Sequence, residues 1–199
     1  VDYPRDERLG YAELLPLVLD VLPRDRPFAL LGESFGGPLA LRVAAARPDG
    51  LKALILCATF VSCPLPIVPA WAAPLVPDLP FRVFPQLSRL KALLGGYLTG
   101  ELRALSREAL SSVRSDVLAH RTREAIRTDV SRELAQLDLP LLYIQGRYDR
   151  VVPGRNLKHI QRIKPSVKVV QLPAPHMVLQ TEAESAAAAI AGFLAKISA

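Results

Sequence analysis

One serine of the sequence stands in a setting that favours nucleophilic chemistry. It is Ser34, in the stretch Gly32-Glu33-Ser34-Phe35-Gly36, which fits the pattern G-x-S-x-G. Apolar runs precede and follow the pattern, which predicts a sharp turn between a strand and a helix. Such a turn holds the hydroxyl out at a helix N-terminus, where free N–H groups stabilise negative charge. We therefore expect Ser34 to act as a nucleophile, provided that a base and an acid come from elsewhere in the chain.

The serine needs a base, because its hydroxyl is a weak nucleophile until the proton is taken. The sequence has three histidines. His120 lies in a charged helical stretch and His159 in a short helix, and both are interpreted as surface or partly buried helix residues. His176 lies in the loop LPAPHMVL directly after a predicted strand. A loop residue without a role is the alternative, but the conjunction with the serine turn favours a general base.

An acid is needed to fix the tautomer of the histidine and to stabilise the imidazolium. Asp149, in QGRYDRVVP, follows a predicted strand immediately, whereas Asp116, Asp129 and Asp138 occupy helical or pre-strand positions. Aspartate also favours turns, so Asp149 has a purely structural alternative. The chain order Ser, Asp, His favours the catalytic interpretation, because one particular scaffold has that order.

The elements that must position these residues alternate between strand and helix. Expected strands are Phe28–Gly32, Leu51–Cys57, Leu139–Gln145 and Val167–Leu172, and Val1–Tyr3 is expected to end a further strand; expected helices are Gly10–Val21, Pro38–Ala46, Asn156–Ile163 and Thr181–Ile197, the last with Thr181 as N-cap. Continuously apolar strands in this order predict an α/β fold with a mostly parallel sheet and helices on both faces. Ligands bind beyond the carboxyl ends of such strands.

The segment 62–137 interrupts the alternation with a proline-dense apolar run and helical stretches. We expect a core of residues 1–61 and 138–199, with 62–137 as a helical cap insertion. Long inserted segments are usually lids or binding loops, although an irregular packed loop is the alternative for the proline run. The cap is expected to contact substrate through Trp71, Phe81 and Phe84.

Composition excludes several classes of protein. The formal net charge is +6, but arginines alternate with acidic residues, which is untypical of a nucleic-acid surface. Two cysteines are too few for a disulfide framework, and the first residues of the sequence do not resemble a signal peptide. No apolar run reaches the ~18 residues of a membrane span, and no histidine pair has metal-ligand spacing. We expect a cytoplasmic protein without nucleic acid, membrane or metal as partner.

Together these motifs resemble those of the α/β-hydrolase superfamily. GESFGG resembles its nucleophile elbow, GRYDRVVP its acid loop, and PAPHMVLQTEA its histidine loop with the closing helix. The resemblance implies a triad of Ser34, Asp149 and His176, with the backbone N–H of Phe35 as one oxyanion donor. It also implies ester hydrolysis through an acyl-enzyme, with a small-molecule ester as substrate and without a cofactor.

The resemblance is incomplete at the start of the sequence. Only 33 residues precede Ser34, and they hold no glycine-containing loop of the kind that supplies the second oxyanion donor. Loss of one donor typically costs about 100- to 1,000-fold in rate. We therefore expect an N-terminally shortened core, either a natural minimal enzyme or a fragment, with low activity or a replacement donor from Tyr3–Arg8. The strand at Phe28 is then an open edge, which predicts a homo-oligomer.

Three functions remain in view at this point. The first is a carboxylesterase for short- to medium-chain acyl groups. The second is a thioesterase or acyltransferase that uses the same triad with another acceptor. The third is a catalytically impaired member that binds a small apolar ligand or a partner chain.

Overall fold

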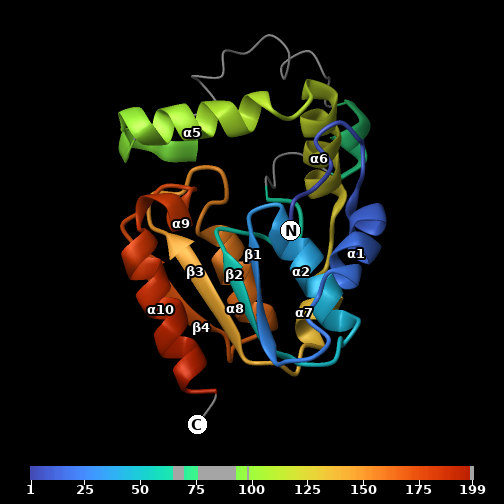
Figure 1. Cartoon of the computed structure of the whole chain (residues 1–199), viewed down its shortest axis with the longest axis vertical. Coiled ribbons are helices and arrows are strands. Elements are labelled where there is room, and N and C mark those ends of the chain that lie inside the picture. Colours follow the sequence, from blue (N-terminus) through green and yellow to red (C-terminus); the bar gives the residue numbers. More distant parts are fainter. Residues whose placement is uncertain (65–69, 76–92, 98, 198–199) are drawn as a thin grey trace.

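The computed structural model describes residues 1–64, 70–75, 93–97 and 99–197. Its sheet is formed by β1 (Phe28–Glu33), β2 (Leu51–Cys57), β3 (Leu141–Gly146) and β4 (Lys168–Leu172). The strands are parallel and lie in the order β1-β2-β3-β4, so β1 and β4 are the edges within the described residues (Figure 1). The expected α/β fold with a parallel sheet is confirmed, and the carboxyl ends of all strands lie at one edge of the sheet.

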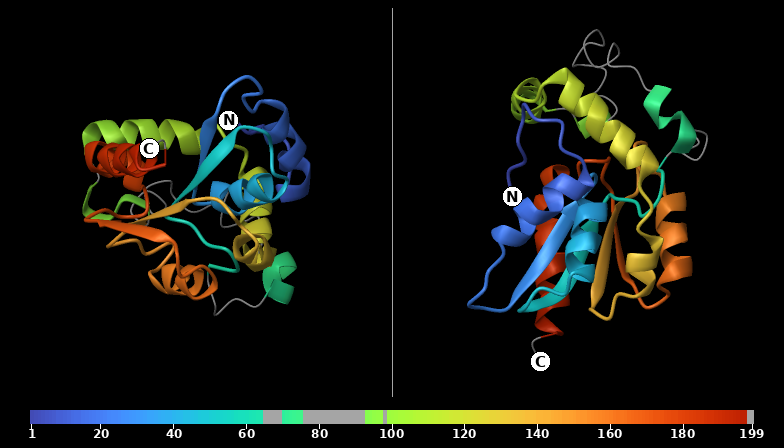
Figure 2. Two further views of the ribbon diagram at one scale, coloured as in Figure 1. Left: turned by 90° about the horizontal axis from the view of Figure 1, so that it is seen from below. Right: turned by 90° about the vertical axis from the view of Figure 1, so that its right-hand side faces the viewer.

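Helices cover both faces of this sheet. On one face, α2 (Gly36–Ala45), α7 (Ser131–Ala135) and α8 (Arg155–Ile163) bury a cluster made mostly of leucines with the strands. On the other face lie α9 (Val178–Thr181) and α10 (Ala183–Ala195). Figure 2 shows α8 and α10 on opposite sides of the strands. The helix α1 (Tyr11–Asp20) packs against α2, and no helix in the described part of the chain is long and apolar enough to span a bilayer.

The segment expected to form a cap contains helices that lie beyond the strand ends and one helix that packs in the core. Its described elements η1 (Ala70–Leu75), η2 (Gly95–Tyr97), α5 (Gly100–Ser111) and α6 (Ser115–Arg127) precede α7. Figure 1 shows α5 and α6 beyond the carboxyl ends of the strands. The helix α7 instead packs against α2 and α8, and Val130 and Leu134 belong to the core cluster. The chain therefore rejoins the core before residue 138.

Arginines tie the first residues of the chain to α6. The carboxylate of Asp116, in the first turn of α6, accepts hydrogen bonds from Arg114 (2.7 and 3.0 Å) and from Arg8 (2.8 Å). These guanidinium groups lower the pKa of Asp116 from 3.8 to about 2. Arg121 donates to the carbonyl oxygen of Pro4 at 2.7 Å. The expected strand at Val1–Tyr3 is wrong, because these residues form no strand, and the backbone that follows them is held at Pro4 by Arg121 of α6.

The end of the chain also differs from the prediction. Thr181 is not the N-cap of one long helix, because it ends α9 and its hydroxyl donates to the carbonyl oxygen of Met177 at 2.8 Å. The next helix, α10, begins at Ala183. The backbone of Glu182 leaves the helical region there, with φ −130° and ψ 46°, so the two helices take different directions.

Candidate active site

A tight turn between β1 and α2 carries Ser34. Its φ of +49° lies in the left-handed region, which is unfavourable for a residue with a side chain. A Cβ added to Gly32 would lie 2.7 Å from the carbonyl oxygen of Gly36 and 2.8 Å from the Cβ of Ala40, so the strand and the helix approach closely only with glycine there. The backbone N–H of Ser34 still donates to the carbonyl oxygen of Cys57, at 3.0 Å. The turn therefore projects the serine from a backbone that stays anchored to β2.

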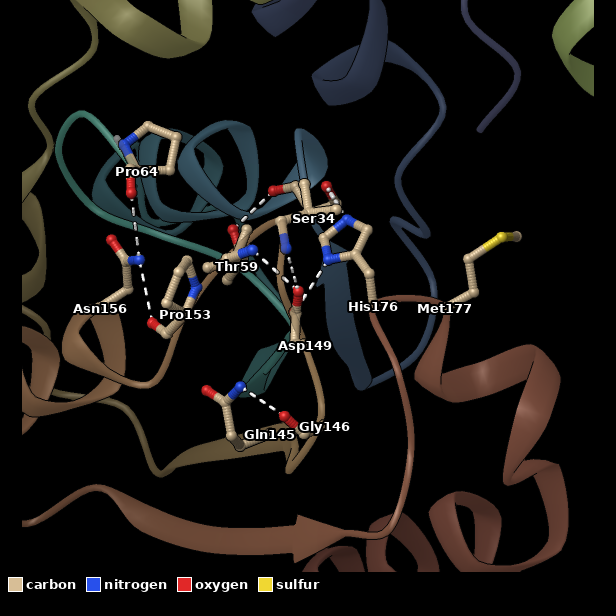
Figure 3. A network of polar contacts seen from close by, with 12 residues as sticks. Ser34, Thr59, Pro64, Gln145, Gly146, Asp149, Pro153, Asn156, His176 and Met177 are labelled. Atoms are coloured by element: carbon tan, nitrogen blue, oxygen red, sulfur yellow. Dashed lines mark hydrogen bonds and ion pairs between the residues drawn. The ribbon is translucent and has the colours of Figure 1, made fainter. Parts of the chain in front are cut away.

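Three side chains from three loops form one chain of hydrogen bonds (Figure 3). The Nε2 of His176 lies 2.8 Å from the Oγ of Ser34, and its Nδ1 lies 2.9 Å from Oδ2 of Asp149. The other carboxylate oxygen of Asp149 accepts from the N–H groups of Val151 and Val152, at 2.8 Å each. The side chains of His176 and Asp149 are 5% and 0% exposed. Both oxygens of the buried carboxylate are therefore satisfied, and its orientation is fixed.

This arrangement selects one tautomer of the imidazole. The carboxylate accepts only, so Nδ1 must donate to Asp149, and in the neutral ring Nε2 is then the acceptor. An acceptor at Nε2 is what the hydroxyl of Ser34 requires to lose its proton. His120 in α6 and His159 in α8 take no part in this chain of hydrogen bonds.

A polar brace behind the turn was not anticipated from the sequence. The hydroxyl of Thr59 donates to the carbonyl oxygen of Ser34 at 2.5 Å. The hydroxyl of Tyr143, on β3, accepts from the N–H of Thr59 at 3.1 Å and donates to its carbonyl oxygen at 2.6 Å. A Cβ on Gly37 would lie 2.0 Å from the Thr59 hydroxyl, so the glycine after the motif makes room for the brace. Burial raises the pKa of Tyr143, which keeps the phenol protonated as a donor.

A cysteine also lies beneath the turn. Cys57 is fully buried at the end of β2. Burial, with smaller contributions from the charges of Glu33 and Asp149, raises the pKa of its thiol. Because a thiolate is the nucleophilic form of cysteine, this neutral thiol does not compete with Ser34 near pH 7.

A cavity of about 740 Å³ opens at these side chains. Ser34, Phe35 and His176 line it on the side of the core. Its other walls are mostly apolar and include side chains from α6 and from the histidine loop, among them Leu118, Ile126 and Met177. The site can therefore accommodate an apolar group next to the serine hydroxyl.

Of the three residues expected to contact substrate, only Trp71 lies among the described residues. Trp71 lies in η1, is 75% exposed and does not line the cavity. Phe81 and Phe84 lie outside the described residues. Leu118 and Ile126 line the cavity from α6, and their helical spacing alone does not distinguish them from ordinary core residues.

The first residues of the chain reach the same cavity. Of the Tyr3–Arg8 segment, which the structure describes in full, Tyr3 lines the cavity. Its ring meets the ring of Phe35 edge to face, with centroids 6.4 Å apart, and the guanidinium of Arg121 lies 5.6 Å from its centroid. Burial raises the pKa of Tyr3, so its hydroxyl stays protonated. A phenol is thus held beside the residue that follows the serine.

Comparison with known proteins agrees with this fold. The family model described as "Serine aminopeptidase, S33" matches residues 17–176. A pimeloyl-[acyl-carrier protein] methyl ester esterase of Neisseria meningitidis serogroup A is 30% identical over 184 residues, which cover 85% of this chain and 58% of the esterase. The chain therefore spans little more than half the length of that relative.

Solved structures with the same fold include two hydrolases. The enol-lactonase of Burkholderia xenovorans LB400 has a TM-score of 0.74 and 20% identity, covering 96% of this chain and 75% of the lactonase. MGS-M2, an alpha/beta hydrolase enzyme from a deep-sea metagenome library of the Medee basin, has a TM-score of 0.76 and 19% identity, covering 95% and 73%. With the parallel sheet and the serine turn, these matches show that the chain belongs to the α/β-hydrolase superfamily, in the serine aminopeptidase (S33) family.

Proposed function

We propose that this chain is a serine hydrolase that cleaves carboxylic esters through an acyl-enzyme. The observation that carries the proposal is the unbroken chain of hydrogen bonds from Asp149 through His176 to Ser34, at 2.9 and 2.8 Å. A chain of this kind makes the serine nucleophilic without a cofactor. The name of the Neisseria relative, a methyl ester esterase, supports ester cleavage as the reaction.

The reaction proceeds in two halves. The Oγ of Ser34 attacks the ester carbonyl carbon while Nε2 of His176 takes the hydroxyl proton, and Asp149 stabilises the resulting imidazolium. The negative charge on the carbonyl oxygen is met by the backbone N–H of Phe35, at the start of α2, where helical N–H groups lack partners. Collapse of the tetrahedral intermediate expels the alkoxide, which takes the proton from His176. Water then repeats the sequence and releases the acid.

The walls of the cavity favour a short- to medium-chain acyl group. Leu118, Ile126 and Met177 offer apolar contact next to the serine. Each buried methylene of a ligand contributes about 0.8 kcal/mol. Butyrate and hexanoate esters should therefore bind more tightly than acetate.

The test is hydrolysis of p-nitrophenyl acetate, butyrate and hexanoate by the wild type and by Ser34→Ala. The wild type should show saturable turnover, and S34A should fall to the background rate. Ser185→Ala, at an exposed position of α10, is the matched control and should retain full activity. Equal rates for the wild type and S34A would exclude the hydrolase and leave a binding role.

A covalent probe gives an independent readout. A fluorophosphonate should label the peptide that contains Ser34 in the wild type and in S185A, and should fail to label S34A. Butyryl-CoA offered beside the oxygen ester distinguishes a thioesterase, which has the same triad but prefers the thioester.

A further inference from the structure

A carboxylate next to the nucleophile has no role in the triad. It belongs to Glu33, the last residue of β1. One of its oxygens accepts from the side-chain amide of Gln180 at 3.2 Å, and the backbone N–H of Leu179 also donates to the carboxylate. The other oxygen, Oε1, is buried and has no hydrogen-bond partner among the described residues. A buried carboxylate oxygen without a partner is costly, so its position beside a nucleophile calls for an explanation.

The contacts of Glu33 connect two parts of the site that are remote in sequence. Glu33 immediately precedes Ser34, whereas Leu179 and Gln180 lie in α9, the short helix that follows His176 and Met177. The carboxylate accepts from the first turn of α9, where N–H groups lack partners within the helix. It thus fixes the start of that helix, and with it the histidine loop, against the residue that carries the nucleophile.

The same carboxylate also acts on the charge of the imidazole. Glu33 directly precedes Ser34, whose Oγ lies 2.8 Å from Nε2 of His176, and the charge of the imidazolium lowers the pKa of Glu33. The imidazolium exists only after the proton has left Ser34, so a carboxylate nearby favours the transition state over the resting state. Asp149 supplies this stabilisation through Nδ1, and Glu33 adds to it from the side of the serine turn.

We propose that Glu33 is a positioning residue of the ester hydrolase, which anchors α9 so that His176 stays in contact with Ser34 and which stabilises the imidazolium. This inference rests on the proposed hydrolase function. It assigns a role to the variable residue that precedes the serine in the G-x-S-x-G motif of this chain.

Titration of the neighbouring groups is consistent with this role. Burial raises the pKa of Glu33, and the amide of Gln180, the charge of His176 and the N–H of Leu179 oppose that rise. The thiol of Cys57, from β2, also interacts with Glu33 and is neutral because burial raises its pKa. The carboxylate of Glu33 therefore attracts the imidazolium of His176 only when it is ionised.

The experiment compares Glu33→Gln with Gln180→Ala. Glutamine has the shape of glutamate without its charge, so E33Q should lower kcat about tenfold, leave KM within twofold, and move the acid limb of kcat/KM to lower pH. Q180A keeps the charge and removes one anchor of α9, so it should lower kcat without moving the acid limb to lower pH. Glu184→Gln, an exposed carboxylate of α10, is the matched control and should leave all three quantities unchanged.

Two outcomes overturn the inference. The first is an E33Q enzyme with wild-type kcat and an unmoved acid limb, while S34A is inactive; the hydrolase then stands and the role of Glu33 falls. The second is an equal loss in E33Q and Glu33→Asp with an unmoved acid limb in both, which indicates packing alone. If S34A retains activity, the hydrolase itself fails, and the two failures are thereby distinguished.

Discussion

Replacing Asp149 by asparagine tests the geometry of the site most directly. An asparagine amide has one acceptor oxygen and one donor nitrogen, where the carboxylate had two acceptors. If the oxygen faces the N–H groups of Val151 and Val152, the NH₂ group faces Nδ1 of His176. The imidazole must then accept at Nδ1 and carry its proton on Nε2, which points at Ser34 and leaves the serine without a base.

The opposite orientation of the amide restores the tautomer of His176 with its proton on Nδ1. The free-energy cost of this orientation can be worked out from the hydrogen bonds that it breaks. It places the NH₂ group against two N–H donors and breaks the two bonds of 2.8 Å that fix the carboxylate. Each unsatisfied buried group costs about 1–3 kcal/mol, so the two together cost about 2–6 kcal/mol. At 1.36 kcal/mol per tenfold, the active orientation becomes about 30- to 3 × 10⁴-fold rarer. The variant also lacks the negative charge that stabilises the imidazolium, so kcat should fall by ~10⁴, in the upper part of this range.

The assay is p-nitrophenyl butyrate hydrolysis, with circular dichroism to verify folding. Asp138→Asn is the control, because Asp138 is an exposed carboxylate that precedes β3 and should leave kcat unchanged. A folded D149N enzyme within tenfold of the wild-type kcat would refute the argument, since it would show that His176 is oriented by something other than Asp149.

Three further changes and one physical property are open to measurement. Gly37→Ala should lower the melting temperature and kcat together, since the added Cβ would lie 2.0 Å from the Thr59 hydroxyl and overpacking of this kind costs about 1–3 kcal/mol. Tyr143→Phe strands the buried N–H and C=O groups of Thr59, and denaturant unfolding should show a loss of about 1–3 kcal/mol for each. The lowered pKa of Asp116, about 2 against 3.8, stabilises the fold above pH 4, and this contribution is lost as the pH falls toward 2; D116N should therefore show a shallower acid transition by circular dichroism. Light scattering should report an assembly larger than one chain if the open edge of β1 pairs with a second copy, and a strictly monomeric protein would contradict that expectation.

The sheet and the turn that carries the serine were predictable because their signals are local. Apolar runs of strand length mark β1 and β2 without reference to the rest of the chain, and the first run ends at Gly32 and the polar pair Glu33-Ser34. Ser34, Asp149 and His176 were singled out because each follows such a run, and parallel strands end at one edge of the sheet. The tight approach at Gly32 follows from the motif itself.

The supports of the site were not predictable because they depend on register and on contacts distant in sequence. Thr59 meets Tyr143 only because β2 and β3 pair with Cys57 opposite Ile144. Glu33 and Gln180 are 147 residues apart. The break at Glu182 was missed because Thr181 and Glu184 have the spacing of a capping box, which competes with the actual boundary between α9 and α10.

The three side chains of the site come from positions 34, 149 and 176, and the span from Ser34 to His176 is 142 residues. Contacts between residues so far apart form late in folding, because closure of long loops costs entropy before it is rewarded. A refolding chain in which the serine turn has formed but β4 has not yet paired with β3 would not hydrolyse esters. The rate at which turnover recovers after dilution from denaturant would then report the pairing of β4 with the sheet. The rate of change in far-ultraviolet ellipticity would report the earlier formation of the helices.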